Sequence, residues 1–398
     1  MVLLTFKRLC TALKIWPCLT AAFLIATAIA SPSDAPHFPV NGGGNYFSNP
    51  EPVALWTGQT SIRDLIGPIA LRNANKLIQG FLRTPGLWPK VANVTTTRPF
   101  IFFHQRKAGG SSIRATLHAG AKKKNLKSYI PCLSSEKKLR CDTYTLPEKL
   151  TAENAAVIYG GHIPWGEPQN KYERFLHDEA GSREFSCATN FREPLSRVAS
   201  CLHFRFPEPF ENKCITDMDT DVLLQYLKKP DTYGSSCLNE PFRIMSGIRT
   251  DVFADKLDVC TPHKRSELIS GVHPEFRIAL TLTLKHIMKC SPLILEAPES
   301  YTMAQQRFDD ASGVRFVTRS GGMVHLNAKR NNHTCGDAKK HPWQQTNLHL
   351  MLCVTAVEQM LYRAVLQKTE CVANGTPPDK CGQGIETTHI SPFPFVHI

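Results

Sequence analysis

The sequence predicts an α/β protein in which a parallel sheet is flanked by helices. Short apolar runs, typical of strands covered on both faces, alternate with segments of helical spacing. The predicted strands are Phe100–Phe103, Ala155–Tyr159, Glu184–Asn190 and Pro292–Ala297. Strands that alternate with helices favour a parallel sheet, because parallel neighbours need a long crossover connection.

The predicted helices lie between and after these strands. One covers Ser112–Ala119, and Pro194 opens another, in which Leu195, Val198 and Leu202 recur at helical spacing. Further helices are predicted over Val222–Leu227, Pro241–Ser246, Glu275–Met288, Met303–Phe308 and Leu348–Leu366. The last of these shows the clearest amphipathic pattern.

The N-terminus predicts entry into the secretory pathway. Lys7, Arg8 and Lys14 precede the apolar stretch Ile15–Ala30, which is shorter than the roughly 20 residues of a full membrane span. Small residues at its end also fit a cleavage site. Residues 1–30 are therefore either a signal peptide or a signal-anchor, and both send the rest of the chain into the lumen.

Composition and cysteines agree with that compartment. The formal net charge of +13 favours anionic ligands, and the predicted luminal location argues against nucleic acid. Twelve of the 14 cysteines lie beyond residue 30 without CxxC spacing, which favours disulfides over a zinc ribbon. We expect the pairs Cys132–Cys141 and Cys214–Cys237, although either could be joined elsewhere. Possible glycosylation sequons start at Asn93, Asn332 and Asn374.

The first predicted strand runs into a turn suited to an anion. Lys107 supplies a positive charge, two glycines let the backbone approach a ligand, and the first N–H groups of the next helix point at it. The candidate binding residues are Lys107, Ala108, Gly109, Gly110, Ser111 and Ser112. The lysine precedes the glycines, unlike a Walker A loop, which disfavours ordinary ATP or GTP hydrolysis. Lys122–Ser135 is predicted to be a basic, solvated loop.

A second anion-binding segment follows the third predicted strand. Arg192 stands at the carboxyl end of that strand, where open α/β sheets bind ligands. Its guanidinium can hold a phosphate through two parallel hydrogen bonds, and Ser200 can add a hydroxyl. The alternative is that Arg192 pairs with Glu193 and that Ser200 is merely exposed on a helix.

Together the two segments resemble the sulfotransferases that use 3′-phosphoadenosine 5′-phosphosulfate (PAPS), especially the secretory-pathway carbohydrate family. Lys107–Ser112 is similar to that family's 5′-phosphosulfate loop, and Arg192–Ser200 to its 3′-phosphate motif, Arg-Asp/Glu-Pro-x-x-Arg-x-x-Ser. The resemblance implies the sulfotransferase fold, a P-loop-like central parallel sheet flanked by helices, with PAPS as co-substrate. The chain departs from the family at Arg106, where proline is common, and at Glu193, where aspartate is usual.

The resemblance also implies a domain organisation. It covers residues 97–370, which we expect to form the catalytic domain. Residues 31–96, rich in Pro, Gly, Asn and Ser, are predicted to be a stem that allows short helices over Ile62–Leu82. Residues 371–398 form a predicted C-terminal tail.

Two further segments resemble parts of the family. Tyr159–Trp165 is similar to the Gly-His segment that carries the catalytic base in glycosaminoglycan-type members, and Asn239–Gly247 to a segment that closes over the nucleotide. The resemblance implies that His162 removes the acceptor's proton, a role that suits histidine near neutral pH, while Lys107 stabilises the departing phosphate. The rival bases are His104, His118, His203 and Glu167. This scheme requires no metal.

The sequence therefore predicts a sulfotransferase that acts on a carbohydrate hydroxyl, with a glycan or proteoglycan as its partner, anionic glycans included. Its expected location is the Golgi lumen, as a single-pass type II membrane protein, or outside the cell after signal cleavage. The alternatives are sulfonation of a protein tyrosine, a non-enzymatic basic glycan-binding protein on the same fold, and a secretory-pathway kinase. A kinase needs an acidic metal pair, which the sequence does not suggest.

Overall fold

A computed structural model describes most of the predicted domain and part of its flanks. The described residues are 68–86, 94–130, 150–151, 153–167, 185–204, 215–228, 236–248, 274–308, 315 and 345–382. The predicted signal or anchor over residues 1–30 lies outside them. Within the described residues, no helix combines the length and the apolar character needed to cross a membrane.

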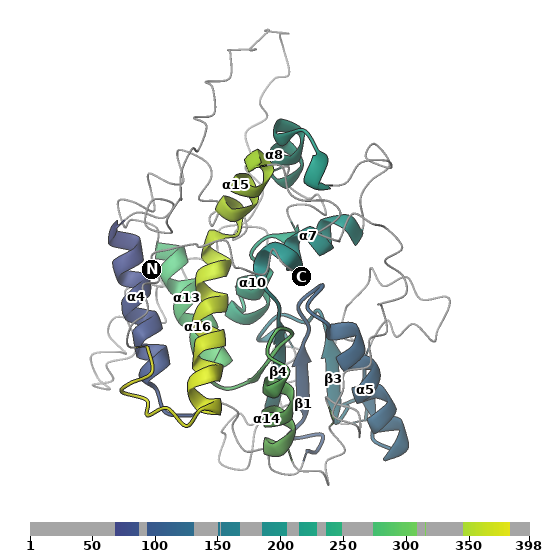
Figure 1. Ribbon diagram of the computed structural model, residues 1–398. Coiled ribbons are helices and arrows are strands. Elements are labelled where there is room, and N and C mark those ends of the chain that lie inside the picture. The colour runs from purple at the N-terminus through teal and green to yellow at the C-terminus, as the bar shows by residue number, and fades with distance from the viewer. Residues whose placement is uncertain are drawn as a thin grey trace, which may run out of the picture. The chain divides into compact units, whose positions relative to one another are not determined.

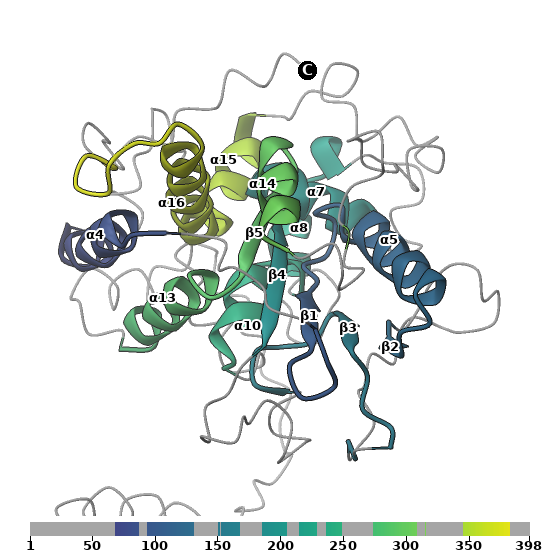
Figure 2. The same cartoon turned by 90° about the horizontal axis from the view of Figure 1, so that it is seen from below.

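A five-stranded sheet in the order β2-β3-β1-β4-β5 forms the centre of the fold, and every pair is parallel (Figure 1, Figure 2). The strands are β1 (Phe100–Phe103), β2 (Ser128–Tyr129), β3 (Ile158–Gly161), β4 (Ser186–Phe191) and β5 (Ser291–Ile294). The predicted α/β class with a parallel sheet is therefore confirmed.

The chain segments that follow the neighbouring strands β1 and β4 run toward opposite edges of the sheet. Strand β1 pairs with β3 on one side and β4 on the other, so that Phe103 faces Gly161 and Thr189. The chain leaves β1 toward β2 and leaves β4 toward β5, which lies beyond β4 at the opposite edge. This divergence makes the carboxyl ends of β1 and β4 the topological switch point, where open α/β sheets bind ligands.

Helices cover both faces of the sheet (Figure 2). They are α4 (Pro68–Arg83), α5 (Gly110–Lys123), α7 (Pro194–Phe204), α8 (Thr220–Lys228), α10 (Glu240–Ser246), α13 (Pro274–Ile287), α14 (Glu299–Arg307), α15 (Gln345–Val354) and α16 (Ala356–Ala373), with a 3-10 turn at Ile215–Asp217. Because side chains alternate along a strand, Phe100 and Phe102 pack with α5 and α14, and Ile101 and Phe103 pack with the opposite cluster.

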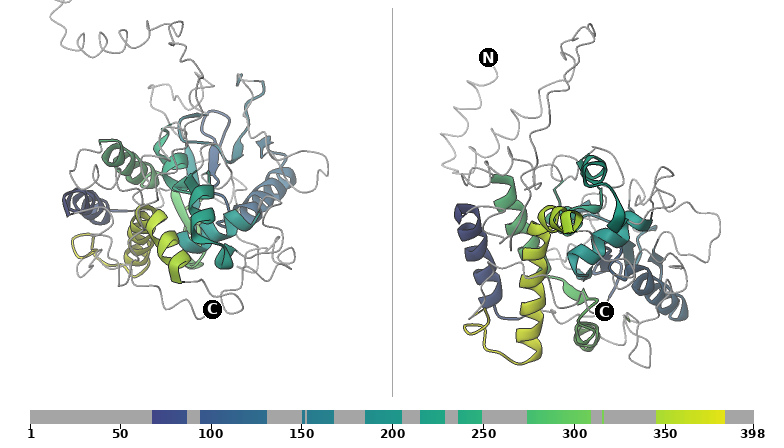
Figure 3. Two further views of the ribbon diagram at one scale, coloured as in Figure 1. Left: turned by 90° about the horizontal axis from the view of Figure 1, so that it is seen from above. Right: turned by 45° about the horizontal axis from the view of Figure 1, so that its top comes forward.

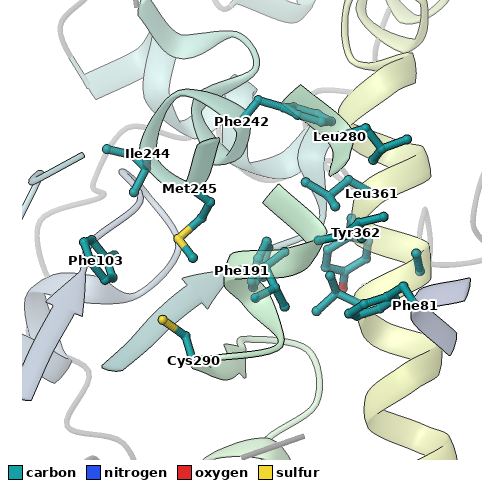
Figure 4. Packing of buried hydrophobic residues seen from close by; sticks show 14 of the residues in the cluster. Phe81, Phe103, Phe191, Phe242, Ile244, Met245, Leu280, Cys290, Leu361 and Tyr362 are labelled. Carbon is teal, nitrogen blue, oxygen red and sulfur yellow. The ribbon is translucent and has the colours of Figure 1, made fainter. Parts of the chain in front are cut away.

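That opposite cluster is the larger core (Figure 4). It joins Phe103 and Phe191 of the sheet to Met245 of α10, Leu280 of α13 and Leu361 of α16. A smaller apolar cluster lies between α7, α8 and α15, above the carboxyl ends of the strands (Figure 1, Figure 3). The two clusters together fix α7 and α10 at the end of the sheet where the switch point lies.

Helix α4 comes from the range assigned to the stem, yet its apolar face is part of the larger core. Ala74, Ile78 and Leu82 are at most 1% exposed. The buried Lys368 Nζ on α16 donates to the carbonyl of Leu82 at 2.6 Å, at the end of α4 where helix carbonyls lack partners. The structure thus places this helix in the same core as the sheet.

Disulfides join Cys187 to Cys290, Cys201 to Cys237, and Cys371 to Cys381. The expectation that the chain carries disulfides is confirmed. The expected pair Cys214–Cys237 is wrong, because Cys237 bonds to Cys201 across the small cluster beside α7. The expected pair Cys132–Cys141 lies outside the described residues.

Candidate functional site

The loop between β1 and α5 forms the centre of the candidate site. The chain leaves the buried strand at Phe103 and must reverse before Gly110, where α5 begins. Two residues accomplish this with left-handed backbone conformations, Lys107 at φ 60° and Gly109 at φ 78°. A lysine in this region is uncommon, and such residues concentrate at functional sites.

Asn190, near the end of β4, fixes this loop. Its Oδ1 accepts the Gln105 N–H at 2.7 Å, and its Nδ2 donates to the carbonyls of Gln105 and Ala108 at 2.9 and 2.8 Å. The neighbouring Thr189 donates to the Phe103 carbonyl and accepts from the Gln105 side chain. The end of β4 therefore acts as a template for the loop after β1.

The first turn of α5 is suited to an anion. Gly109 provides no side-chain cap, and the Ser112 N–H donates to the Gly109 carbonyl at 3.1 Å. Gly110 is required here, because a Cβ would overlap the ring of His104. Ser111 is exposed beside this turn. Backbone N–H groups and the helix dipole at such an end favour negative charge.

Lys107 lies half-buried at this turn. Burial and the nearby charge of Arg192 lower the pKa of its ammonium to about 8. The group is therefore still mostly protonated at neutral pH. Bringing an anion to this place would stabilise its charge further.

Arg192 reaches the same loop from the end of β4. Its Nη1 donates to the Lys107 carbonyl at 3.1 Å. Burial lowers the pKa of Arg192, while the carboxylates of Glu296 and Glu193 act in the opposite direction. The structure thus brings the two predicted anion-binding segments together, although 85 residues separate them.

The N-terminus of α7 differs from that of α5. The Glu193 carboxylate accepts the N–H groups of Leu195 and Ser196 at 2.9 and 2.7 Å, and the Gln359 side chain bonds to it as well. Because a side chain of the protein already caps this helix, an anion beside Arg192 must be held by side chains. Ser200 lies half-buried in the second turn of α7.

The second arginine of this segment does not face solvent. Arg197 is fully buried and forms hydrogen bonds with Glu358 at 2.6 and 2.8 Å, with Glu240 at 3.1 Å and with the carbonyl of Cys237 at 2.7 Å. Burial acts to lower its pKa, but the carboxylates of Glu358 and Glu240 raise it overall. Arg197 therefore ties α7 to α16 and α10.

His162 follows β3 and lies against the same loop. Its Nδ1 is 2.9 Å from the carbonyl of His104, and the two imidazole rings stack with their centroids 4.1 Å apart. A carbonyl only accepts hydrogen bonds, so Nδ1 carries the proton and Nε2 keeps its lone pair. Burial lowers the pKa of His162 to about 4, although Glu240 raises it, so the ring is neutral at pH 7.

The rival bases are placed differently. His104 is 4% exposed, and its Nδ1 faces the guanidinium of Arg114, a donor, at 3.4 Å. His118 is exposed on the third turn of α5, well past the loop. Glu167 is half-buried in the turn after His162, and the side chain of His203 lies outside the described part of the chain.

Sequence reasoning missed two residues that organise the site. Asn190 holds the loop after β1, and Glu240 accepts the Arg106 N–H at 3.0 Å. An amide side chain at the buried carboxyl end of a predicted strand is a signal that could have identified Asn190. Glu240 lies within Asn239–Gly247, a segment that the sequence analysis singled out, but its contact with Arg106, 134 residues away in sequence, leaves no local signal.

Comparisons with protein-family models, with curated proteins and with solved structures found no match to this chain. Among the described residues, no cluster of His, Cys, Asp or Glu could hold a metal ion. The residues that bear on function lie in the loop after β1, at the N-termini of α5 and α7, and around His162.

Proposed function

We propose that this protein is a PAPS-dependent sulfotransferase that transfers a sulfonate group to a hydroxyl of a carbohydrate. One observation carries the proposal: the guanidinium of Arg192 bonds to the carbonyl of Lys107, so two cationic segments meet at the switch point of a parallel sheet. A ligand with two separate phosphate groups fits such a pair. Sulfonate donors of the PAPS class carry both.

The residues present fit that group. The uncapped first turn of α5, the left-handed Gly109 and the charged Lys107 suit the 5′ end, together with the loop through Ser112. Arg192 and Ser200 would hold the 3′-phosphate through side chains, since Glu193 occupies the amides of α7. Bound PAPS supplies the sulfonate group and leaves as the bisphosphate.

The chain's own residues supply the remaining chemistry. A bond forms between the acceptor oxygen and sulfur while the bond from sulfur to the phosphate oxygen breaks, so negative charge grows beside Lys107. Its ammonium stabilises that charge more in the transition state than in the ground state. The acceptor's proton goes to His162 Nε2, because Nδ1 already donates to the His104 carbonyl.

The proposed acceptor and location rest on the sequence. The N-terminal segment and the positive net charge favour a luminal enzyme that meets glycans, anionic ones included, and the Golgi is the proposed compartment. The proposed topology is a type II membrane protein, or a secreted form after cleavage. Tyrosine sulfonation is the same chemistry on a different hydroxyl, so an acceptor panel must include peptides.

The test is a transfer assay with the full chain, labelled PAPS, and a panel of glycans and peptides. Lys107→Ala and Arg192→Ala should abolish transfer and weaken binding of the product 3′-phosphoadenosine 5′-phosphate (PAP). His162→Ala should lose about 10²-fold or more in turnover yet still bind PAP. Lys122→Ala removes one positive charge from the exposed end of α5 and should leave both properties unchanged.

Two results would contradict the proposal in different ways. If the wild-type chain binds neither PAP nor PAPS, the proposed nucleotide site does not exist. A chain that binds glycans and transfers nothing would favour the non-enzymatic glycan-binding alternative.

A further inference from the structure

Glu240 is a buried carboxylate that contacts Arg106, Arg197 and His162. It starts α10 and is 1% exposed. Its Oε2 accepts the Arg106 N–H at 3.0 Å and an Nη1–H of Arg197 at 3.1 Å. Its Oε1 lies 3.4 Å from Arg106 Nε and 3.8 Å from His162 Nδ1. One carboxylate thus contacts the anion loop, helix α7 and the candidate base.

We propose that Glu240 is a positioning residue whose negative charge, placed beside His162, stabilises the ring while the ring carries the acceptor's proton. This inference rests on the proposed function, because it assigns Glu240 a role in that reaction. The proton moves from the acceptor hydroxyl to Nε2, and the ring becomes an imidazolium. The positive ring keeps its Nδ1–H bond to the His104 carbonyl, and Nδ1 lies 3.8 Å from Oε1 of the Glu240 carboxylate.

The charges around His162 explain why a carboxylate is needed. From the loop after β1 it faces the guanidinium of Arg106, from α5 that of Arg114, and beneath it lies the ring of His104. The two guanidinium groups oppose protonation of His162, whereas the hydrogen bond from Nδ1 to the His104 carbonyl favours it. Glu240, from α10, is the carboxylate that acts in the opposite direction. Removing it would leave the protonated ring among positive groups in a buried site.

The contact with Arg197 does not by itself explain why a carboxylate is buried at position 240. The Nε and Nη2 groups of Arg197 already bond to both oxygens of Glu358, and Nη2 also reaches the Cys237 carbonyl. The second oxygen of Glu240 is directed at Arg106 and His162 instead. A proline at position 106, which is common in the family this chain resembles, has no N–H to donate. The Arg106–Glu240 contact is therefore a feature of this chain.

The first test measures His162 directly and needs no substrate. Full-length protein with isotope-labelled histidine is titrated by NMR, with the His162 signal assigned by its loss in His162→Asn. In Glu240→Gln, the protonation midpoint of His162 should move to lower pH than in the wild type. Glu358→Gln removes a carboxylate of the same buried network that is bonded to Arg197, and it should leave the midpoint much closer to the wild-type value.

Buried carboxylates can be needed for folding, so a second variant is included. Glu240→Asp keeps the charge but shortens the side chain, and its His162 midpoint should lie between those of the wild type and Glu240→Gln. Circular dichroism confirms the fold of each variant over the pH range used. A His162 midpoint that Glu240→Gln and Glu240→Asp leave unchanged overturns the inference, and so does an equal shift in Glu358→Gln.

The second test follows the reaction. Glu240→Gln should lower kcat about 10- to 100-fold, less than the ~10²–10⁴-fold that a general base itself contributes, and shift the acidic limb of the kcat/KM profile to lower pH. PAP binding should change much less, and Glu240→Asp should recover part of the rate. A rate loss without a shifted limb would mean a structural role and overturn the inference. An inactive wild type whose His162 midpoint still responds to Glu240 would instead refute the proposed function.

Discussion

Replacing Gly110 by alanine tests whether the candidate site depends on close contact between α5 and His104. A Cβ at this position would lie 2.8 Å from His104 Cγ and closer still to Cδ2 and Nε2. The ring has little room to retreat, because it stacks on Phe102 with centroids 5.7 Å apart and on His162 at 4.1 Å. The clash therefore has to be absorbed by the loop or by the helix.

The expected magnitude follows from two opposing effects. Forcing extra atoms into a packed interior typically costs about 1–3 kcal/mol. Alanine in place of glycine within a helix contributes about 0.5–1 kcal/mol in the favourable direction. Gly80 on α4 offers a matched control, since a Cβ there meets nothing within 4 Å. The difference between the two variants in the free energy of unfolding should thus be about 1–3 kcal/mol.

The measurement is urea denaturation followed by circular dichroism, combined with PAP binding by calorimetry. Gly80→Ala should be as stable as the wild type or slightly more so and bind normally. Gly110→Ala should be less stable and bind PAP more weakly, because the displaced His104 borders the anion loop. Equal stability of the two variants would refute the packing argument.

Three further predictions concern charge, loop support and covalent links. Because the pKa of Lys107 is lowered to about 8, its positive charge is lost as pH rises through that value, so PAP affinity measured by calorimetry should fall there. Lys107→Arg, which stays charged, should remove this dependence. Asn190→Ala leaves loop groups unsatisfied and should lower the free energy of unfolding in urea by about 1–3 kcal/mol for each group that stays buried. Mass spectrometry of a non-reduced digest should find Cys201 joined to Cys237, and a peptide that joins Cys214 to Cys237 would contradict the structure.

Three of the four strands that the sequence predicted contain a continuous apolar run, and Glu184–Asn190 does not. Phe100–Phe103 is buried throughout, and so is its neighbour β3, which runs from Ile158 to Gly161 instead of ending at Tyr159. Strand β2 was missed, because Ser128–Tyr129 is a short, half-buried edge strand within the predicted basic loop Lys122–Ser135. Edge strands need no apolar run and often carry lysines.

The predicted single helix over Leu348–Leu366 is two helices in the structure. Helix α15 ends at Val354 and α16 begins at Ala356, with Thr355 between them. The Thr355 hydroxyl donates to the carbonyl of Met351, a local bond that competes with the helix and often bends it. No proline or glycine marks this break, so apolar periodicity alone could not locate it.

The sequence predicted those parts of the candidate site that follow from local patterns. Lysine next to a glycine pair, and arginine at a strand end, are local patterns, and both lie at the switch point. The roles of Asn190 and Glu240 depend on partners 85 and 134 residues away, which no local pattern records. Likewise, nothing in the sequence distinguishes the buried Arg197 from the ligand-facing position proposed for Arg192.

The packing of α4 sets a limit on how the chain can be shortened. A fragment that starts at residue 97, the first residue of the predicted catalytic domain, would lose the helix that covers part of the larger core and strip Lys368 of its carbonyl acceptors. Recombinant forms should therefore retain the chain from Pro68 onward. If the N-terminus anchors the protein, the part that packs on the sheet already includes α4, so any linker to the bilayer is shorter than the predicted stem of residues 31–96.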